Sequence, residues 1–600
     1  MLCHLALALL LSTVGLANQT GSQQPHACGE SDKTVELDNH VTYRGTHKDG
    51  VEAFLGIKYA QDTAGENRFN APKPFTPSPG SFISADRPGP ACPQDVSVGE
   101  DFLPLYLTIF RDTSEDCLSL NVNRPNGTRK GDKLPVMVFI HGGSYIVGAK
   151  DELTSQPGGL IIESVNNGLP VIHVSLNYRL GILGFAKSAA LSTQNAALRD
   201  QRMALEWVQA NIAAFGGDPD NITIHGQSSG GLSVGLQIMA YGGSKPVPFH
   251  KAIAQSQVLE PGLTGKFTDD AMARVLNAST CNTTSADSQA AIDCLRTLSA
   301  KDLIKLQTDT VVGSENIGDI WLPTVDGDIL PSAPSQLLAE GRFAAITTIM
   351  GYTEDDTAPF TDIIIKNATQ TETFFRDYAP AMSEANLQHL LKLYPVGEFT
   401  ANPAANLSAE FYRSARILRD ILMVCEPLLY GQALTKRGQK VYYYDQNQTV
   451  VDGPLESLGL PGLGVVHTSE FAYMFNNISH YDSKHEIVSH ELRSKKANKD
   501  LTVNDYSYNP TASDERLAIR ETRSFSTFAS LGQPSLKGHG TLKGWEPAFG
   551  TDNETRVFVI GSDEEGLHSL RDENSVIGRQ RLEERCAFIN SPEVVAQLQF

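Results

Sequence analysis

The feature that most limits the possible folds of this chain is an alternation of short apolar runs with helix-like stretches. Apolar runs occupy residues 134–140, 170–176, 221–225 and 252–256. Between the second and third runs, residues 199–214 place apolar side chains at helical spacing before a glycine- and proline-rich stop. A second helical stretch covers residues 232–240. Nearly continuous apolar strands separated by helices indicate a parallel sheet buried on both faces, so the sequence predicts an α/β fold.

The length of 600 residues would allow one large domain or several small ones. No internal repeat or low-complexity tract divides the chain. The most polar and least periodic stretch, residues 481–516, is interpreted as a surface excursion rather than a linker, because a strand-like run follows at 556–560. We therefore expect a single domain over residues 18–600, enlarged by long insertions in the connections of the sheet.

Charge and hydropathy exclude two classes of protein. The chain carries 49 Lys and Arg against 69 Asp and Glu, a formal charge of −20. A surface of this sign repels a phosphate backbone, so nucleic-acid binding is not expected. No run of 18 or more apolar residues could span a bilayer, which argues against an integral membrane protein.

The amino terminus is typical of an exported protein. Residues 5–11 are apolar and Gly15-Leu16-Ala17 offers the small residues of a cleavage site, so residues 1–17 are predicted to be a signal peptide. The polar carboxyl terminus is too short for a lipid-anchor signal. We expect a secreted protein. Ten glycosylation sequons agree with export and begin at Asn18, Asn126, Asn221, Asn277, Asn282, Asn367, Asn406, Asn447, Asn477 and Asn553.

The turn between the third strand and the following helix carries the clearest chemical signal. Gly226-Gln227-Ser228-Ser229-Gly230 fits the G-x-S-x-G pattern in a strand–turn–helix context. Such a turn strains the serine backbone and raises its hydroxyl above the sheet, near amides that favour an anion. The alternative is a glycine-rich packing turn without chemistry. We predict that Ser228 is a nucleophile.

A serine hydroxyl needs a base beside it and donors for the oxyanion that develops during attack. Gly142 and Gly143 follow the strand at 134–140, so their amides can point into the same crevice. The amide of Ser229, directly after the nucleophile, is the expected third donor. These three amides are the predicted oxyanion hole.

At this point the chain resembles a known family, the type-B carboxylesterases, which also include cholinesterases and fungal Candida-type lipases. The resemblance rests on SEDCLSLNV at 114–122, NYRLG at 177–181, ALRDQRMALEWV, FGGDP at 215–219 and AIAQS. It implies an α/β-hydrolase fold with a large, mostly parallel central sheet flanked by helices. It also implies hydrolysis of small-molecule or lipid carboxylic esters through an acyl-enzyme intermediate, with no cofactor and no metal.

The resemblance also locates the other members of a catalytic triad. Its G-x-x-x-D-E-G pattern aligns Asp356 with the catalytic acid, although the family usually has glutamate there and Thr357 replaces the glycine. Asp355 and Glu354 remain alternatives. Among the histidines that follow in the chain, His467 ends a glycine-rich loop and its surroundings resemble the catalytic-histidine segment. His141 and His225 precede the acid and are interpreted as structural.

Seven cysteines remain if the signal peptide is removed, and sequence alone does not determine how they pair. The family resemblance implies three disulfides and leaves Cys28 over. The implied pairs are Cys92–Cys117, Cys281–Cys294 and Cys425–Cys586.

The substrate is less constrained. Residues 93–116 contain no tryptophan of the kind that binds quaternary ammonium in cholinesterases, and Gln227 replaces a common acidic residue, so choline esters are not expected. The apolar segment 102–110 is either a lipase-like lid or an ordinary Ω-loop. The alternatives to a carboxylesterase are a lid-gated lipase on triacylglycerol or sterol esters, a biosynthetic acyl transferase and a non-catalytic adhesion or binding module.

Overall fold

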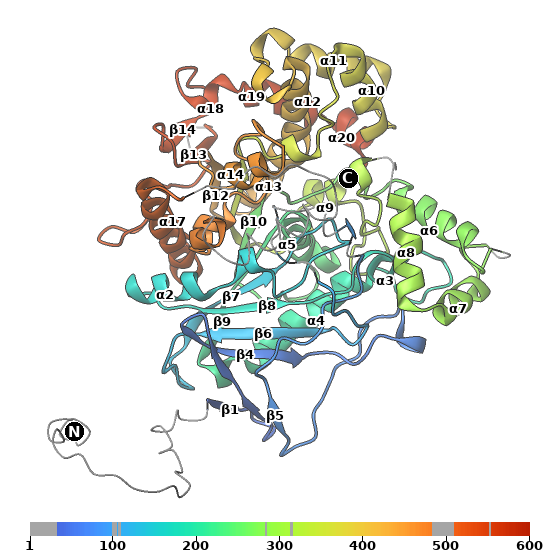
Figure 1. Ribbon diagram of the computed structural model, residues 1–600, viewed down its shortest axis with the longest axis vertical. Helices are drawn as coiled ribbons and strands as arrows, with labels where there is room; N and C mark the ends of the chain where they lie inside the picture. Colours follow the sequence, from blue (N-terminus) through green and yellow to red (C-terminus); the bar gives the residue numbers. More distant parts are fainter. Residues whose placement is uncertain are drawn as a thin grey trace, which may run out of the picture.

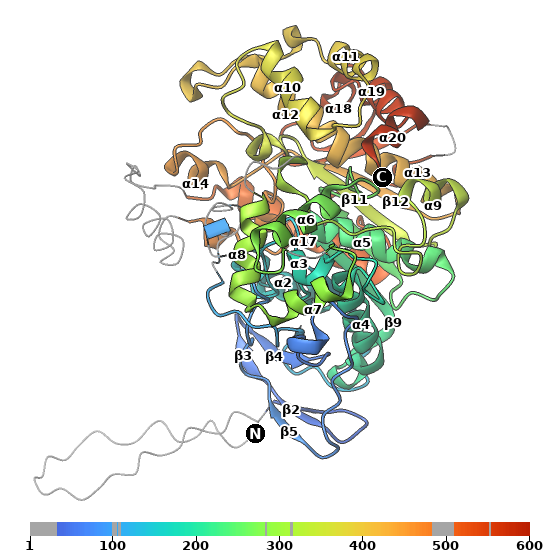
Figure 2. The same ribbon diagram turned by 90° about the vertical axis from the view of Figure 1, so that its right-hand side faces the viewer.

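The structure is a computed structural model that describes residues 33–600 except 96, 99–104, 106–107, 109, 283–284, 312–315, 483–508 and 551–553. Figures 1 and 2 show it from two directions. The predicted signal peptide, the sequons at Asn18 and Asn553, and Cys28 lie outside the described residues. So does most of the 102–110 segment.

The body of the molecule is an 11-stranded sheet with the order β14-β13-β12-β11-β10-β9-β7-β8-β6-β4-β3. The strands from β8 to β13 in this order are parallel to their neighbours, and the outer strands are antiparallel. A separate three-stranded sheet with the order β1-β2-β5 lies near the amino terminus. The large-sheet strands are β3 (Thr46–Lys48), β4 (Val51–Lys58), β6 (Ser119–Arg124), β7 (Leu134–Ile140), β8 (Ile172–Leu176), β9 (Gly217–Gln227), β10 (Lys251–Gln255), β11 (Thr347–Thr353), β12 (Val441–Gln446), β13 (Arg556–Ile560) and β14 (Gly566–Ser569), and the small-sheet strands are β1 (Thr34–Glu36), β2 (Thr42–Arg44) and β5 (Phe82–Ser84).

Helices cover both faces of the large sheet (Figure 1). The longer ones are α4 (Ala196–Asn211), α5 (Ser229–Met239), α6 (Phe267–Ala278), α8 (Ala300–Val311), α10 (Ala368–Tyr378), α11 (Glu384–Leu393), α12 (Ala409–Arg419), α13 (Glu426–Lys436) and α17 (Ala512–Leu531). The shorter ones are α2 (Gly158–Asn166), α3 (Gly181–Phe185), α7 (Gln289–Thr297), α9 (Pro334–Glu340), α14 (Asp452–Ser457), α15 (Phe471–Met474), α18 (Val576–Arg579), α19 (Leu582–Ile589) and α20 (Pro592–Leu598).

The packing of strand β7 explains why residues 134–140 form a nearly continuous apolar run. Val136, Val138 and Ile140 pack into the hydrophobic core that contains α4 and α5. Met137 and Phe139, which alternate with them, pack into a second core with α2, α15 and α17. Because both faces are covered, each side chain from Val136 to Ile140 is buried.

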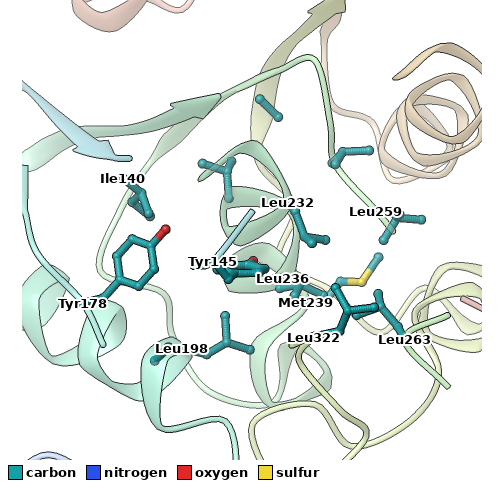
Figure 3. Close-up of a cluster of buried hydrophobic side chains, with 14 of the residues drawn as sticks. Ile140, Tyr145, Tyr178, Leu198, Leu232, Leu236, Met239, Leu259, Leu263 and Leu322 are labelled. Carbon is teal, nitrogen blue, oxygen red and sulfur yellow. The ribbon is translucent and has the colours of Figure 1, made fainter. Parts of the chain in front are cut away.

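The first core places the helix that follows the G-x-S-x-G turn. Leu232, Leu236 and Met239 of α5 are buried beside Leu198 of α4 and Tyr178 of the loop after β8 (Figure 3). Every residue of α5 is buried. Its amino terminus is therefore held in a fixed position at the carboxyl end of β9.

The expected elements are present with small shifts of their boundaries. The helix predicted over 199–214 corresponds to α4 and a 3-10 turn that continues to Phe215. The helical segment ends at Gly216, whose φ is +93°. The predicted surface excursion at 481–516 was too long. Its last residues belong to α17, where Thr511 caps the helix and Asp514 completes a capping box. Within the described residues, no helix combines the length and apolar character that crossing a bilayer requires.

The three implied disulfides are present, joining Cys92 to Cys117, Cys281 to Cys294 and Cys425 to Cys586. One of the predicted glycosylation sites has a buried asparagine. Asn477 is buried, and its Nδ2 donates to the carbonyl oxygens of Thr154 and Gln156 at 3.1 and 2.9 Å. Both contacts of the Asn477 amide nitrogen are thus with backbone carbonyl oxygens inside the protein. The exposed sequon asparagines are Asn126, Asn277, Asn282, Asn367 and Asn406, and Asn221 and Asn447 are half-buried.

Candidate active site

Ser228 lies at the junction of β9 and α5 in a strained backbone conformation, with φ 59° and ψ −133°. The glycines on either side are required by close packing. A Cβ on Gly226 would lie 2.4 Å from the carbonyl oxygen of Gly230, and one on Gly230 would lie 2.1 Å from that of Ile140. The turn is therefore pressed against the end of β7.

The loop after β7 runs beside this turn. Gly143 has φ +104°, and a Cβ there would lie 2.3 Å from the carbonyl oxygen of Val147. The Tyr145 amide donates to Ser229 Oγ at 3.2 Å, which ties the loop to the start of α5. In the described part of the chain, the backbone amides of Gly142, Gly143 and Ser229 donate no hydrogen bond. These three donors remain available to an anion at this end of the sheet.

His467 and Asp356 form a buried pair next to the turn. The imidazole Nδ1 lies 2.5 Å from Asp356 Oδ1, and the two side chains are 2% and 0% exposed. Asp356 Oδ2 accepts from the Thr353 amide at 2.9 Å, which fixes the plane of the carboxylate. With Asp356 ionised, this contact places the imidazole proton on Nδ1 and leaves Nε2 as an acceptor.

The two alternative acids have other partners. Glu354 forms ion pairs with Arg416 at 2.7 Å and Arg419 at 3.0 Å. Asp355 accepts from the Val465 amide at 3.0 Å. The structure thus brings Asp356, and neither of its two neighbours, against His467. Thr357, which stands where the family has glycine, is buried and donates to the carbonyl oxygen of Ala415.

The second imidazole nitrogen has an unexpected neighbour. His467 Nε2 lies 3.1 Å from Nε2 of Gln227, the residue before the serine. Among the described residues, the Ser228 hydroxyl makes no hydrogen bond to His467, although the serine is adjacent in the chain to the residue that does. The ring of Phe360 stands edge-on to the imidazole, with centroids 5.0 Å apart. No local pattern predicted either contact, because Gln227 and His467 are 240 residues apart.

Two further carboxyls influence the charge of the site. Burial raises the pKa of Asp319 to about 6, although a hydrogen bond from Ser144 and the charge of His467 oppose the rise. Burial, reinforced by the charge of Asp356, raises the pKa of Glu470 to about 8. At neutral pH the Glu470 side chain is therefore largely protonated.

The histidines interpreted as structural are buried in the sheet. His141 stacks on Tyr178 with centroids 4.3 Å apart, and burial lowers its pKa to about 4. His225 Nε2 lies 3.1 Å from His173 Nε2, and burial lowers the pKa of both rings. The imidazoles of His141, His173 and His225 are therefore neutral at physiological pH. The described residues contain no group of three or more His, Cys, Asp or Glu side chains arranged to hold a metal ion.

A serine on a strained strand–helix turn, a buried histidine–carboxylate pair and unpaired amides at the same sheet edge define the class of α/β-hydrolase enzymes. A family model described as the carboxylesterase family matches residues 39–588. The chain belongs to the carboxylesterase family and is a carboxylic ester hydrolase by class.

Relatives extend along most of the chain. A secreted lipase of Arthroderma benhamiae is 46% identical over 94% of this chain and 96% of its own length. An inactive carboxylesterase-like protein of Byssochlamys spectabilis is 34% identical over 92% and 93%. Lipase 2 of Geotrichum candidum is 34% identical over 73% of this chain and 83% of its own length.

Solved structures share the fold. Aspergillus niger EstA superposes with a TM-score of 0.74 at 23% identity, covering 95% of this chain and 99% of that chain. A thermophilic PNB esterase gives a TM-score of 0.70 at 25% identity, covering 92% of this chain and 100% of that chain.

Proposed function

We propose that the protein is a secreted serine esterase in which Ser228, His467 and Asp356 form a catalytic triad and water is the final acyl acceptor. The observation that carries this proposal is the convergence at one sheet edge of the strained Ser228 turn, the buried His467–Asp356 pair and three amides without acceptors. The serine turn, the Gly142–Gly143 amides, Asp356 and His467 come from four different segments of the chain.

In the proposed reaction, Ser228 Oγ attacks the ester carbonyl carbon while its proton passes to His467 Nε2. The amides of Gly142, Gly143 and Ser229 bind the oxyanion of the tetrahedral intermediate. Collapse breaks the bond to the leaving alcohol, which takes the proton from the imidazolium. Water then attacks the acyl-enzyme with His467 again acting as base, and the acid is released with Ser228 restored. Asp356 holds the Nδ1 proton and stabilises the imidazolium throughout.

Export is the second part of the proposal. The relative in Arthroderma benhamiae is named a secreted lipase, and residues 1–17 have the pattern of a signal peptide. Cleavage after Ala17 would leave Asn18 as the first residue of the mature protein. Amino-terminal sequencing of the protein from culture medium tests this, and a mature chain that still begins at Met1 would contradict it.

A lipid ester is a second candidate substrate, and a specific surface feature favours it. The loop that carries Phe360 over the imidazole continues to Ile363 and Ile364, whose side chains are 47% and 62% exposed. Exposed apolar residues next to a catalytic histidine suit contact with a lipid–water interface. Two of the three relatives named above are called lipases. Choline esters remain unexpected, because residues 93–116 contain no tryptophan.

The decisive test is reaction with a fluorophosphonate probe, followed by peptide mapping of the adduct. We expect the adduct on Ser228, and we expect Ser228→Ala to lose both labelling and hydrolysis of p-nitrophenyl butyrate while its unfolding temperature stays within a few degrees of wild type. Failure of the wild-type protein to be labelled would instead favour a non-catalytic binding module, such as the inactive relative in Byssochlamys spectabilis suggests. A panel of esters would then identify the acyl and alcohol groups.

A further inference from the structure

One nitrogen of the proposed general base has two candidate partners. His467 Nδ1 is engaged by Asp356, so Nε2 is the atom that must receive the Ser228 proton. An unprotonated imidazole nitrogen has a single lone pair in the ring plane, and it accepts one good hydrogen bond. In the structure this lone pair faces the Gln227 side-chain amide at 3.1 Å.

The chemistry of the amide decides its orientation. The Gln227 side chain is 0% exposed, and its Oε1 has no hydrogen-bond partner among the described residues. Turning the amide over would set Oε1 against the unprotonated Nε2, which brings two acceptors together. The arrangement with Nε2 of Gln227 donating to Nε2 of His467 is therefore the favourable one while the imidazole is neutral.

Gln227 and Ser228 are consecutive residues. Gln227 contacts the imidazole in the structure, and the proposed reaction requires Ser228 to meet the same nitrogen. We propose that Gln227 is a positioning residue that competes with Ser228 for Nε2 of His467 and holds the general base in a resting arrangement until acylation begins. The amide N–H must leave Nε2 before the Ser228 proton can be transferred, and no covalent change occurs in Gln227. The proposal rests on the assignment of Ser228 and His467 to the esterase reaction.

The charged surroundings of His467 matter for the test. Asp356 contacts its Nδ1, Asp319 lies within electrostatic range on the side of the Gly142–Ser144 loop, and Glu470 follows it by three residues and faces Asp356. These groups are unchanged in variants of Gln227. A difference between such variants therefore reports on the group that faces Nε2.

The neighbouring strand offers a matched control. Gln255 ends β10 and is the cross-strand partner of Gln227 in the sheet. It is also 0% exposed with an unpartnered Oε1, but its Nε2 faces the Tyr444 hydroxyl at 3.3 Å instead of an imidazole. The substitution Gln255→Met makes the same change of chemistry at the same level of the sheet without touching His467.

The first experiment measures the rate of fluorophosphonate labelling at neutral pH. Gln227→Met keeps the shape of the side chain but cannot donate, so we expect labelling about three- to tenfold faster than wild type, the range that one neutral hydrogen bond accounts for. Gln255→Met is expected to stay within about twofold of wild type. A Gln227→Met protein with wild-type unfolding temperature and an unchanged or slower rate would overturn the proposal.

The second experiment measures the pH profile of kcat/KM for Gln227→Glu. A carboxylate facing Nε2 stabilises the imidazolium, so the acid limb should move to higher pH by about one unit. An acid limb at the wild-type position would overturn the proposal even if Gln227→Met failed to fold. Should Ser228→Ala be inert while both Gln227 variants match wild type, the esterase assignment stands and only the competition is rejected.

Discussion

Gly230, the third residue after β9, lies so close to Ile140 at the end of β7 that a Cβ on it would stand 2.1 Å from the Ile140 carbonyl oxygen. The same added Cβ would stand 2.9 Å from the carbonyl oxygen of His141. This contact joins the turn that presents Ser228 to the loop that presents the Gly142 and Gly143 amides. The distance between the proposed nucleophile and the proposed oxyanion donors therefore depends on the absence of a side chain at Gly230.

We predict that Gly230→Ala will separate these two elements. The added methyl must move the turn or the strand, which we expect to destabilise the protein by about 1–3 kcal/mol and to reduce kcat by on the order of 10²-fold. Gly397→Ala is the control, because a Cβ there meets nothing within 4 Å. Urea unfolding and ester hydrolysis measure both effects. A Gly230→Ala protein with wild-type kcat would show that the close approach does not position the donors.

A second prediction separates the two adjacent aspartates. Asp356→Asn can still accept from the Thr353 amide but no longer holds the Nδ1 proton on His467, so kcat should fall by about 10³–10⁴-fold. Asp355→Asn keeps an acceptor for the Val465 amide and is expected to change kcat by less than about tenfold. Steady-state kinetics on a dissolved ester measure both. Equal losses in the two variants would contradict the assignment of the acid.

A third prediction concerns the pH dependence of stability. Burial raises the pKa of Glu470 from 4.5 to about 8, so the folded state binds a proton that the unfolded state releases above about pH 4.5. This contribution to stability is present at low pH and is lost as pH rises toward 8. The slope is at most about 1.4 kcal/mol per pH unit.

Glu470→Gln removes the titrating group while keeping the size of the side chain. We therefore expect the free energy of unfolding of wild type, relative to this variant, to fall between pH 5 and pH 8. Urea titrations at several pH values give the difference. A constant difference across this range would mean that Glu470 does not retain its proton in the folded protein.

The fourth prediction tests contact with a lipid surface. Replacing Ile363 and Ile364 by aspartate should reduce the rate on tributyrin emulsion by about tenfold and leave the rate on dissolved p-nitrophenyl butyrate nearly unchanged, because the pair makes its contact outside the reacting centre. Phe82→Asp is the control, since Phe82 is 62% exposed in β5 of the small sheet, away from the active site (Figure 1). A parallel loss on both substrates would point to damage of the site rather than to an interface.

Local patterns in the sequence determined the strands, the helices and the serine turn. Apolar runs such as 134–140 identify strands buried on both faces, because side chains on alternate faces must all avoid water. The glycines around Ser228 identify the turn, because their backbone approaches others too closely for a Cβ. These signals act over a few residues and can be read without knowing the rest of the chain.

Only the tertiary structure decided which neighbour each functional group meets. Glu354, Asp355 and Asp356 are consecutive acids, and the packing of α12 arginines and of the loop before His467 directs the first two away from the imidazole. The Gln227–His467 contact and the burial of Asn477 likewise join segments distant in sequence. Such contacts depend on the sum of many weak packing interactions, so no short pattern carries them.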